Sequence, residues 1–411
     1  MLDSINRQRI ALFFNTQELG GAERSIIEQM RQIEDEFEIT FFIPFNNHLG
    51  NSSLLSSALK NNNQLNIKYY WYPHFLYSIS RRFASTNVIK IMLGGLALIM
   101  AYGKLVSLKK FDIVYANGTK AGVFLIIYLF LSRYRGLLVW HFRDYPPAWR
   151  FSKWIDMLFQ LKRRFKVYLI GNSISVKQEI MNVFKKADRY DYVYNPIEKQ
   201  MHKKMHNRSH GKTIGVVSMF APWKGIHNII LFAALYGERL KEMGINKIKI
   251  YGRNIYKTSG EHCFYGDQIK KLASKLGADL VSFDENKNPD EIFQEIDLLI
   301  HPSIKKEPFG RVILEAFRCG IPVLSTGLGG AGELVIPDQT GFIFNKNDLE
   351  SLFLLIKKIY SSETDLGEII RNASAFEELV TNSVGKRLKL FLKGLDFEQE
   401  IEDGKGNIVG S

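Results

Sequence analysis

The sequence predicts an α/β protein made of two Rossmann-like doubly wound domains that face a central cleft. Apolar strand patterns alternate with helical patterns along the chain, and the alternation starts afresh after a polar, basic stretch at 202–212. This alternation is typical of parallel sheets covered by helices. Because ligands of open parallel sheets bind beyond the carboxyl ends of the strands, two such sheets would line one cleft with their loops.

The first predicted domain covers residues 1–198. It opens with the strand RIALFFN, which is followed by a glycine turn and a helix from about residue 22 to residue 33. Further strand patterns lie at 37–44, 111–118, 136–142 and 167–173.

The second predicted domain covers residues 199–385. Its strand patterns lie at 213–220, 245–253, 280–285, 297–303 and 321–326, with helical patterns between them. Residues 386–411 are predicted to form a helix that packs back on the first domain, followed by a flexible tail.

Composition indicates a cytoplasmic protein with large cores. Of the 411 residues, 46% are hydrophobic, and the cysteines Cys263 and Cys319 make no disulfide framework. The N-terminus has no apolar signal core. The longest uncharged apolar runs, 91–103 and 121–132, are shorter than the roughly 18 residues of a membrane span. We expect them to be buried helices first and membrane-facing helices second.

Positive charge is concentrated in the first half of the chain. Residues 1–195 hold 26 Lys and Arg against 14 Asp and Glu, a balance of +12 out of the total of +13. Aromatic and basic residues mix between 69 and 110, where no acidic residue occurs. This mixture suits an anionic membrane surface, so we expect peripheral association with the cytoplasmic membrane face through 69–110. A core hairpin with a basic rim is the alternative, and no nucleic-acid partner is expected.

Three short motifs follow predicted strands, and each also has a purely structural interpretation. Gly20 and Gly21 open a helix, whose N-terminus favours phosphate, although a tight turn alone needs the same residues. His141 in WHFRDY lies at the end of a predicted strand, where it could contact a substrate or be a core histidine with its hydrogen bonds satisfied. Lys224 in FAPWKG is placed to meet a phosphate, or is an exposed loop lysine.

The fourth motif is EPFGRVILEAF at 307–317, which sets carboxylates beside an apolar helix pattern. Glu307 lies in a loop and Glu315 in the second helical turn, and a buried carboxylate needs a partner. The pair could be a general acid and base, metal ligands, or hydroxyl binders. A metal would want more carboxylates or histidines nearby, and the chain has no D-x-D pair. Hydroxyl binding fits best, because a carboxylate can accept from two adjacent hydroxyl groups, as on a ribose. The alternative is an ordinary ion pair with Arg311 or Arg318.

Together these motifs resemble the retaining glycosyltransferases with the GT-B fold, the family 4 type with its E-x7-E signature. The resemblance extends from residue 9 to about residue 395 and is diffuse between 45 and 110. It rests on these segments: GGAER, NSISVKQEI, YNPIE, PWKG, SIKKEPFGRVILEAFRCGIPVLST, GLGGAGELV and DQTGFIF.

The resemblance implies transfer of a sugar from a nucleotide-diphosphate-sugar donor, with retention at the anomeric carbon and without a metal or other cofactor. The second domain would bind the donor. The first would bind a glycan or lipid-linked acceptor, in surface polysaccharide biosynthesis. A nucleotide-sugar epimerase, a phosphorylase and a non-catalytic nucleotide-sugar-binding homologue remain alternatives within the same fold.

The resemblance also assigns roles around the two glutamates. Glu315 would bind the ribose hydroxyls, and Glu307 would hold hydroxyls of the donor sugar as a catalytic residue. The backbone amides of Phe309, Gly310 and Arg311 would face the sugar and the phosphates.

The remaining implied roles concern the other motifs. Lys224 would neutralise the diphosphate, His141 would contact the sugar near the reacting centre, and Gly20 and Gly21 would let the first loop approach the donor. The family usually carries an arginine six or so residues before the Lys-Gly pair, where this chain has Ser218 and Met219. We expect Arg253 to substitute for that arginine.

Overall fold

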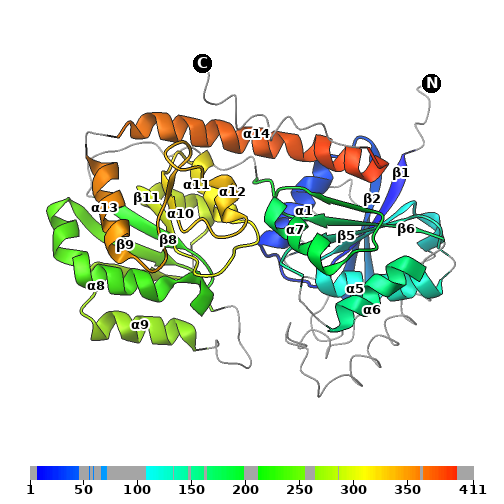
Figure 1. Cartoon of the computed structure of the whole chain (residues 1–411), viewed down its shortest axis with the longest axis horizontal. Helices are drawn as coiled ribbons and strands as arrows, with labels where there is room; N and C mark the ends of the chain where they lie inside the picture. Colours follow the sequence, from blue (N-terminus) through cyan, green and yellow to red (C-terminus); the bar gives the residue numbers. More distant parts are fainter. Residues whose placement is uncertain are drawn as a thin grey trace. The chain divides into compact units, whose positions relative to one another are not determined.

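The computed structural model describes residues 7–45, 55, 59, 66–71, 108–132, 134–146, 150–161, 164–198, 212–254, 264–285, 287–361 and 364–395. They fall into two compact units (Figure 1). Unit 1 lies within Met1–Pro196 and Asn382–Glu398, and unit 2 lies within Ile197–Thr381. Most of the expected membrane segment, the apolar run at 91–103 and the predicted tail lie outside the described residues.

Unit 1 is built on a seven-stranded parallel sheet with the order β3-β2-β1-β4-β5-β6-β7. The order reverses between β1 and β4, the kind of position at which open parallel sheets bind ligands. The strands are β1 (Gln8–Phe13), β2 (Phe37–Phe45), β3 (Asn66–Trp71), β4 (Ile113–Asn117), β5 (Leu137–Phe142), β6 (Lys166–Gly171) and β7 (Arg189–Tyr192).

Helices cover both faces of this sheet, which is why its central strands are continuously apolar. Alternate side chains of β1 enter different cores: Ala11 and Phe13 enter one, and Ile10 and Leu12 the other. The first core receives α5 (Thr119–Leu131), α6 (Arg150–Leu161) and α7 (Ile174–Val183), and the second receives α1 (Gly21–Arg31). The apolar run at 121–132 forms α5 and is mostly buried, as predicted.

Unit 2 repeats this plan with a six-stranded parallel sheet of order β10-β9-β8-β11-β12-β13. Its order reverses between β8 and β11. The strands are β8 (Lys212–Val217), β9 (Ile245–Tyr251), β10 (Val281–Asp284), β11 (Leu298–His301), β12 (Val323–Ser325) and β13 (Phe342–Ile343). The two sheets confirm the predicted pair of doubly wound, Rossmann-like α/β units.

The helices of unit 2 also lie on both faces of its sheet (Figure 1). α8 (Ile226–Glu242), α9 (Tyr265–Lys275) and α13 (Leu349–Tyr360) pack into one core. On the opposite face, a Cβ on Gly215 would lie 2.6 Å from Ile296, the residue after α10 (Pro289–Glu295). The other helices are α11 (Arg311–Arg318) and α12 (Ala331–Leu334), with a 3-10 turn at Pro222–Lys224.

The last helix, α14 (Leu366–Lys393), belongs to both units. In unit 2, Glu377 makes a two-pronged ion pair with Arg318, at 2.7 and 3.0 Å. In unit 1, Arg387 pairs with Asp191 at 2.5 Å and lies 3.7 Å from the centre of the Tyr192 ring. Among the described residues, no helix is long and apolar enough to cross a membrane.

Three strands were not predicted from the sequence. β3 and β7 are the edge strands of the first sheet, and β13 is an edge strand of only 2 residues in the second. An edge strand has one unpaired side and need not be apolar, and β7 reads RYDY. β7 therefore lacks the continuous apolar pattern that marked the central strands, and β13 is too short to show one.

Candidate functional site

The loop after β8 presents Lys224 at the carboxyl end of the second sheet. Pro222 begins the 3-10 turn, and Gly225 ends it in the left-handed region with φ of 70°. A Cβ on Gly225 would lie 2.0 Å from the carbonyl oxygen of Pro302, so only glycine allows this approach. The backbone N–H of Ile304 also donates to the carbonyl of Trp223 at 2.9 Å. The loops after β8 and β11, neighbouring strands at the reversal, are thereby joined.

Glu307 lies in the loop after β11 and faces Lys224. The Lys224 Nζ donates to Glu307 Oε2 at 2.5 Å, and the Ser303 hydroxyl donates to the same oxygen at 3.1 Å. The side chains are only 11% and 15% exposed. Burial raises the pKa of the Glu307 carboxyl, but the charge of Lys224 and these hydrogen bonds outweigh it, so the pKa is lowered. Glu307 is therefore ionised at neutral pH and does not act as an acid in this state.

The backbone of Glu307 is fixed as firmly as its side chain. Its N–H donates to the carbonyl of Leu328 at 2.9 Å, and its carbonyl accepts from the N–H of Gly330 at 2.7 Å. A Cβ on Gly330 would lie 2.4 Å from the carbonyl oxygen of Pro308. The GLGG segment thus packs directly against the EPFG segment, which explains why both belong to one motif.

His301, the last residue of β11, is a third buried group in this cluster. Its Nε2 lies 3.8 Å from Glu307 Oε2, and its Nδ1 lies 3.3 Å from the hydroxyl of Ser325 at the end of β12. Burial lowers the pKa of His301 to about 4, with Lys224 adding to the lowering and Glu307 opposing it. The imidazole is therefore neutral beside the ion pair.

α11 begins directly after the Glu307 loop and carries Glu315. Gly310 precedes the helix in the left-handed region, with φ of 97°, and Phe309 is buried in front of it. The Arg311 Nε donates to Glu315 Oε1 at 2.8 Å, and an Arg311 Nη nitrogen lies 3.7 Å from Glu198 Oε1. The buried Glu315 thus has the Arg311 ion pair considered above, whereas Arg318 pairs with a different carboxylate.

Arg253 follows β9 as an exposed residue. Its carbonyl accepts from the N–H of Phe220 at 3.1 Å, and Gly252 brings its own backbone against the carbonyl of Ser218. The hydroxyl of Ser218, the residue in place of the usual arginine, is buried without a hydrogen-bond partner. Among the described residues, Arg253 forms no ion pair with Glu307, the carboxylate that Lys224 contacts. Its role as a substitute for the usual arginine stays a prediction.

The carboxyl end of the first sheet holds His141, in β5. Its Nδ1 shares a hydrogen bond of 2.7 Å with the hydroxyl of Tyr115, and its Nε2 is buried without a hydrogen-bond partner among the described residues. Burial lowers the pKa of His141 well below its usual value, and the nearby Arg143 charge lowers it further. Because the Tyr115 hydroxyl keeps its proton, it can donate to Nδ1 and leave the neutral ring with an N–H at Nε2.

Arg143 is buried two residues beyond His141 and holds several elements together. Its Nε and one Nη donate to the amide oxygens of Asn117 and Asn195, both at 2.7 Å, and the other Nη donates to Gln29 Oε1 at 3.1 Å. The partners come from the end of β4, the segment after β7, and α1. Burial lowers the pKa of the guanidinium to about 10, so it is a cation hydrogen-bonded by neutral amides.

Gly20 and Gly21 lead into α1, which begins at Gly21. Gly20 has an extended backbone, with φ of −91°, and its N–H donates to Glu23 Oε2 at 3.2 Å. Burial raises the pKa of Glu23, although its own backbone N–H and the Arg143 charge oppose the rise. The turn is therefore a helix cap close to the Arg143 cluster, and its predicted donor role stays a prediction.

Sequence reasoning missed Arg143, Ser303, His301 and the amides that hold Arg143. One signal was available: asparagines stand at or just after the ends of strands in YANG, IGNS and VYNP. Carboxyl ends of neighbouring parallel strands meet at one edge of the sheet, so these asparagines had to gather there.

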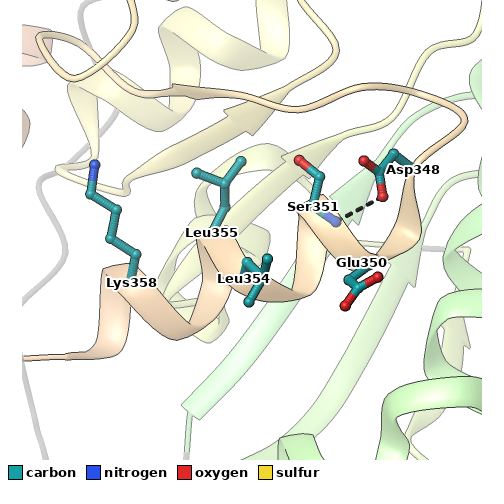
Figure 2. A pocket seen from close by; sticks show the side chains of 6 residues that line it. All are labelled: Asp348, Glu350, Ser351, Leu354, Leu355 and Lys358. Atoms are coloured by element: carbon teal, nitrogen blue, oxygen red, sulfur yellow. Dashed lines mark hydrogen bonds between the residues drawn. The ribbon is translucent and has the colours of Figure 1, made fainter.

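A surface pocket on α13 is separate from these clusters (Figure 2). It is lined by Asp348, Glu350, Ser351, Leu354, Leu355 and Lys358, none of which is a predicted site residue. Within the described ranges, no group of three or more His, Cys, Asp and Glu side chains could hold a metal ion.

Comparison with known proteins shows that Lys224, Glu307 and Glu315 lie in a segment that matches a known family model. Residues 198–376 match the family model described as glycosyl transferases group 1. An uncharacterized glycosyltransferase of Methanocaldococcus jannaschii is 26% identical over 209 residues, which cover 49% of this chain and 54% of that protein. A lipopolysaccharide core biosynthesis mannosyltransferase of Rhizobium meliloti is 32% identical over 100 residues, 23% of this chain and 28% of that protein. The chain spans about half or less of the length of these curated relatives.

Solved structures extend the likeness to both units. The HepE protein of Anabaena in complex with UDP and glucose matches with a TM-score of 0.72 and 21% identity, covering 95% of this chain and 100% of that chain. At this identity the match establishes the fold, which is the two-domain GT-B fold. Together with the domain match, it supports a glycosyltransferase.

Proposed function

We propose that the protein is a retaining glycosyltransferase that moves a sugar from a nucleotide-diphosphate-sugar donor to a glycan or lipid-linked acceptor. The observation that carries this proposal is the partly buried Lys224–Glu307 pair at the reversal of the second sheet, inside the domain that matches group 1 glycosyl transferases. The HepE structure, described in complex with UDP and glucose, supports a nucleotide-sugar donor.

Lys224 would neutralise the diphosphate of the donor. An ammonium group has three N–H donors, so Lys224 can keep its bond to Glu307 and still donate to phosphate oxygens. Charge grows on the diphosphate as the bond from the anomeric carbon to its oxygen breaks, and a fixed cation stabilises that change most. The acceptor hydroxyl then bonds to the anomeric carbon on the same face, and its proton leaves with the diphosphate. No metal ion is required for this step in our proposal.

Two carboxylates would bind hydroxyl groups of the donor. Glu307, held ionised by Lys224, would accept from hydroxyls of the sugar, and Glu315, held by Arg311, would accept from the ribose. Both are oriented by a basic partner before the donor arrives, which reduces the entropy lost on binding. His141 would offer the Nε2 side of its neutral ring to the sugar.

The lipopolysaccharide mannosyltransferase among the relatives supports a role in surface polysaccharide biosynthesis. We place the protein in the cytoplasm, peripheral to the membrane. A non-catalytic nucleotide-sugar-binding homologue is the second candidate, because Ser218 stands where the family usually has an arginine.

The decisive experiment compares Lys224→Ala and Glu307→Ala with a matched control. Lys270 and Glu285 form an ion pair of the same residue types in the same unit, but with side chains 44% and 39% exposed. Thermal-shift screening against UDP, GDP and ADP, and against their sugars, identifies the donor. Sugar transfer to an acceptor panel then gives the turnover, and NMR of the product gives the anomeric configuration. We expect loss of transfer in the first two variants and normal transfer in Lys270→Ala and Glu285→Ala.

Three outcomes would change the proposal. Normal turnover in Lys224→Ala and Glu307→Ala would remove the site assignment. An inverted product would remove the retaining mechanism. Nucleotide binding by the wild-type protein without turnover on any acceptor would favour the non-catalytic homologue.

A further inference from the structure

The outward face of α6 carries three large apolar side chains. Trp154 is 64% exposed, Met157 is 43% exposed and Leu161 is 53% exposed. The spacing i, i+3, i+7 puts them on one side of the helix. The inward side is already satisfied, since Ile155 and Phe159 are buried in the core of unit 1. A surface helix normally turns polar residues to solvent, so this second apolar stripe indicates an interaction surface.

Basic residues stand beside this stripe. Lys153 is exposed next to Trp154, and Arg164 is exposed shortly after the end of α6. Exposed Lys185 and Lys186 are held against the same helix, because their backbone N–H groups both donate to Asp156 Oδ1 at 2.8 Å. The one acidic residue of α6 thus serves as a backbone acceptor.

The neighbouring helix α5 adds apolar surface in the same part of unit 1. α5 packs against α6, as Figure 1 shows. Its last residues, Phe130 and Leu131, are 39% and 65% exposed. Five exposed large apolar side chains thus lie on two adjacent helices of the unit that carries most of the positive charge of the chain.

We propose that this face, defined by Trp154, Met157 and Leu161 with the lysines beside it, docks onto an anionic lipid bilayer. Tryptophan is favoured at the level of lipid headgroups, and exposed lysines are attracted to anionic lipids. A second copy of the chain fits less well. In a two-fold dimer the same patch faces itself, which would bring the lysines of both copies together. None of the residues that define this face belongs to the segment 69–110 considered from the sequence.

Vesicle sedimentation of the full-length protein tests the proposal at low and high salt. The probes are vesicles of phosphatidylglycerol with phosphatidylcholine, and vesicles of phosphatidylcholine alone. We expect binding to the anionic vesicles that weakens with salt. The variant W154S/M157S/L161S should bind at least about tenfold more weakly, since it loses the apolar part of the contact. It should fold normally, because the replaced side chains are exposed.

The matched control is L235S/F264S/L354S, which removes two leucines and one aromatic residue from unit 2. These side chains are 70%, 66% and 54% exposed, and the control should bind like the wild type. A blue shift of tryptophan emission on vesicle binding should be lost in Trp154→Phe, which reports on this one side chain.

Three results would overturn the proposal. They are no binding to anionic vesicles at low salt, equal binding by W154S/M157S/L161S and the wild type, or a change from dimer to monomer in that variant without lipid. The last would identify a second copy as the occupant. Because none of these readouts needs a donor sugar, failure here is distinguishable from failure of the proposed enzyme activity.

Discussion

The two sheets carry polar clusters of similar plan at their carboxyl ends but of different charge. In unit 1, His141 bonds to a hydroxyl and lies beside the buried cation Arg143. In unit 2, His301 lies near a hydroxyl and beside the buried cation Lys224. Burial keeps both histidines neutral. The difference is the partner of the cation, which is a carboxylate in unit 2 and a set of neutral amides in unit 1.

This difference separates two kinds of site. In the Lys224–Glu307 pair the two charges compensate each other, so the diphosphate of the proposed donor would add negative charge where the cation already has a partner. The Arg143 guanidinium instead donates its hydrogen bonds to three amide oxygens from separate elements. We infer that the Lys224–Glu307 cluster of unit 2 responds to a charged ligand. The Arg143 cluster of unit 1 instead maintains a fixed geometry and a neutral His141.

The largest effect is expected when the compensated pair is broken. Lys224→Met leaves the Glu307 carboxylate buried without its cation and should destabilise unit 2 by about 3 kcal/mol. The double variant K224M/E307Q should recover most of this loss without recovering sugar transfer. Urea unfolding of the wild type, both single variants and the double variant measures the coupling. If Lys224→Met is as stable as the wild type, the pair contributes nothing and the contrast with unit 1 disappears.

A smaller loss is expected at the amide-held cation. Arg143→Lys keeps the charge but cannot reach three oxygens in different directions, so it should destabilise unit 1 by about 2 kcal/mol. Urea unfolding again gives the value. Arg189→Lys is a control for changing arginine to lysine at a partly exposed position, where the guanidinium donates to two backbone oxygens instead. An Arg143→Lys protein as stable as this control would show that the amide cluster needs only the charge.

The neutral histidines predict how stability depends on pH. The pKa of His301 is about 4 in the folded protein against 6.5 without the fold. Below pH 6.5 the unfolded chain binds a proton that the folded protein does not, so stability falls as pH decreases from about 6.5 to about 4. His301→Asn should flatten part of this fall in urea midpoints measured across that range. An identical fall in the variant would mean that other groups cause it.

The smallest effect is expected for the proposed substitute cation. Arg253 is exposed, so Arg253→Ala should weaken nucleotide binding by about threefold to tenfold, as solvent-screened charges contribute little. Titration calorimetry with UDP, or with whichever nucleotide binds, gives the affinity, and Arg239→Ala is a control on α8. If the affinity of Arg253→Ala does not change, Arg253 is not the substitute cation, and Lys224 binds the diphosphate without it.

The fold was predictable because its signals are local. Continuous apolar stretches marked the central strands of both sheets, and glycines marked the turns that follow them. The motif EPFGRVILEAF and Lys224 were assigned their roles through a resemblance to a known family, and those roles stay predictions. β7 was missed because its sequence RYDY is polar, and β13 was missed because it has only 2 residues.

The tertiary structure decided which polar groups meet. The sequence could not choose between Arg311 and Arg318 as the partner of Glu315, since both lie within one helical turn of it. In the folded chain Arg318 pairs with Glu377, 59 positions further along, and Arg311 pairs with Glu315. Arg143 was unmarked because its amide partners lie up to 114 positions away. The sequence by itself determined the two sheets and the residue types at their carboxyl ends. Only packing determined the pairings. A buried charge is costly unless it is paired, and the partners available to it are the groups that the fold places at the same sheet edge.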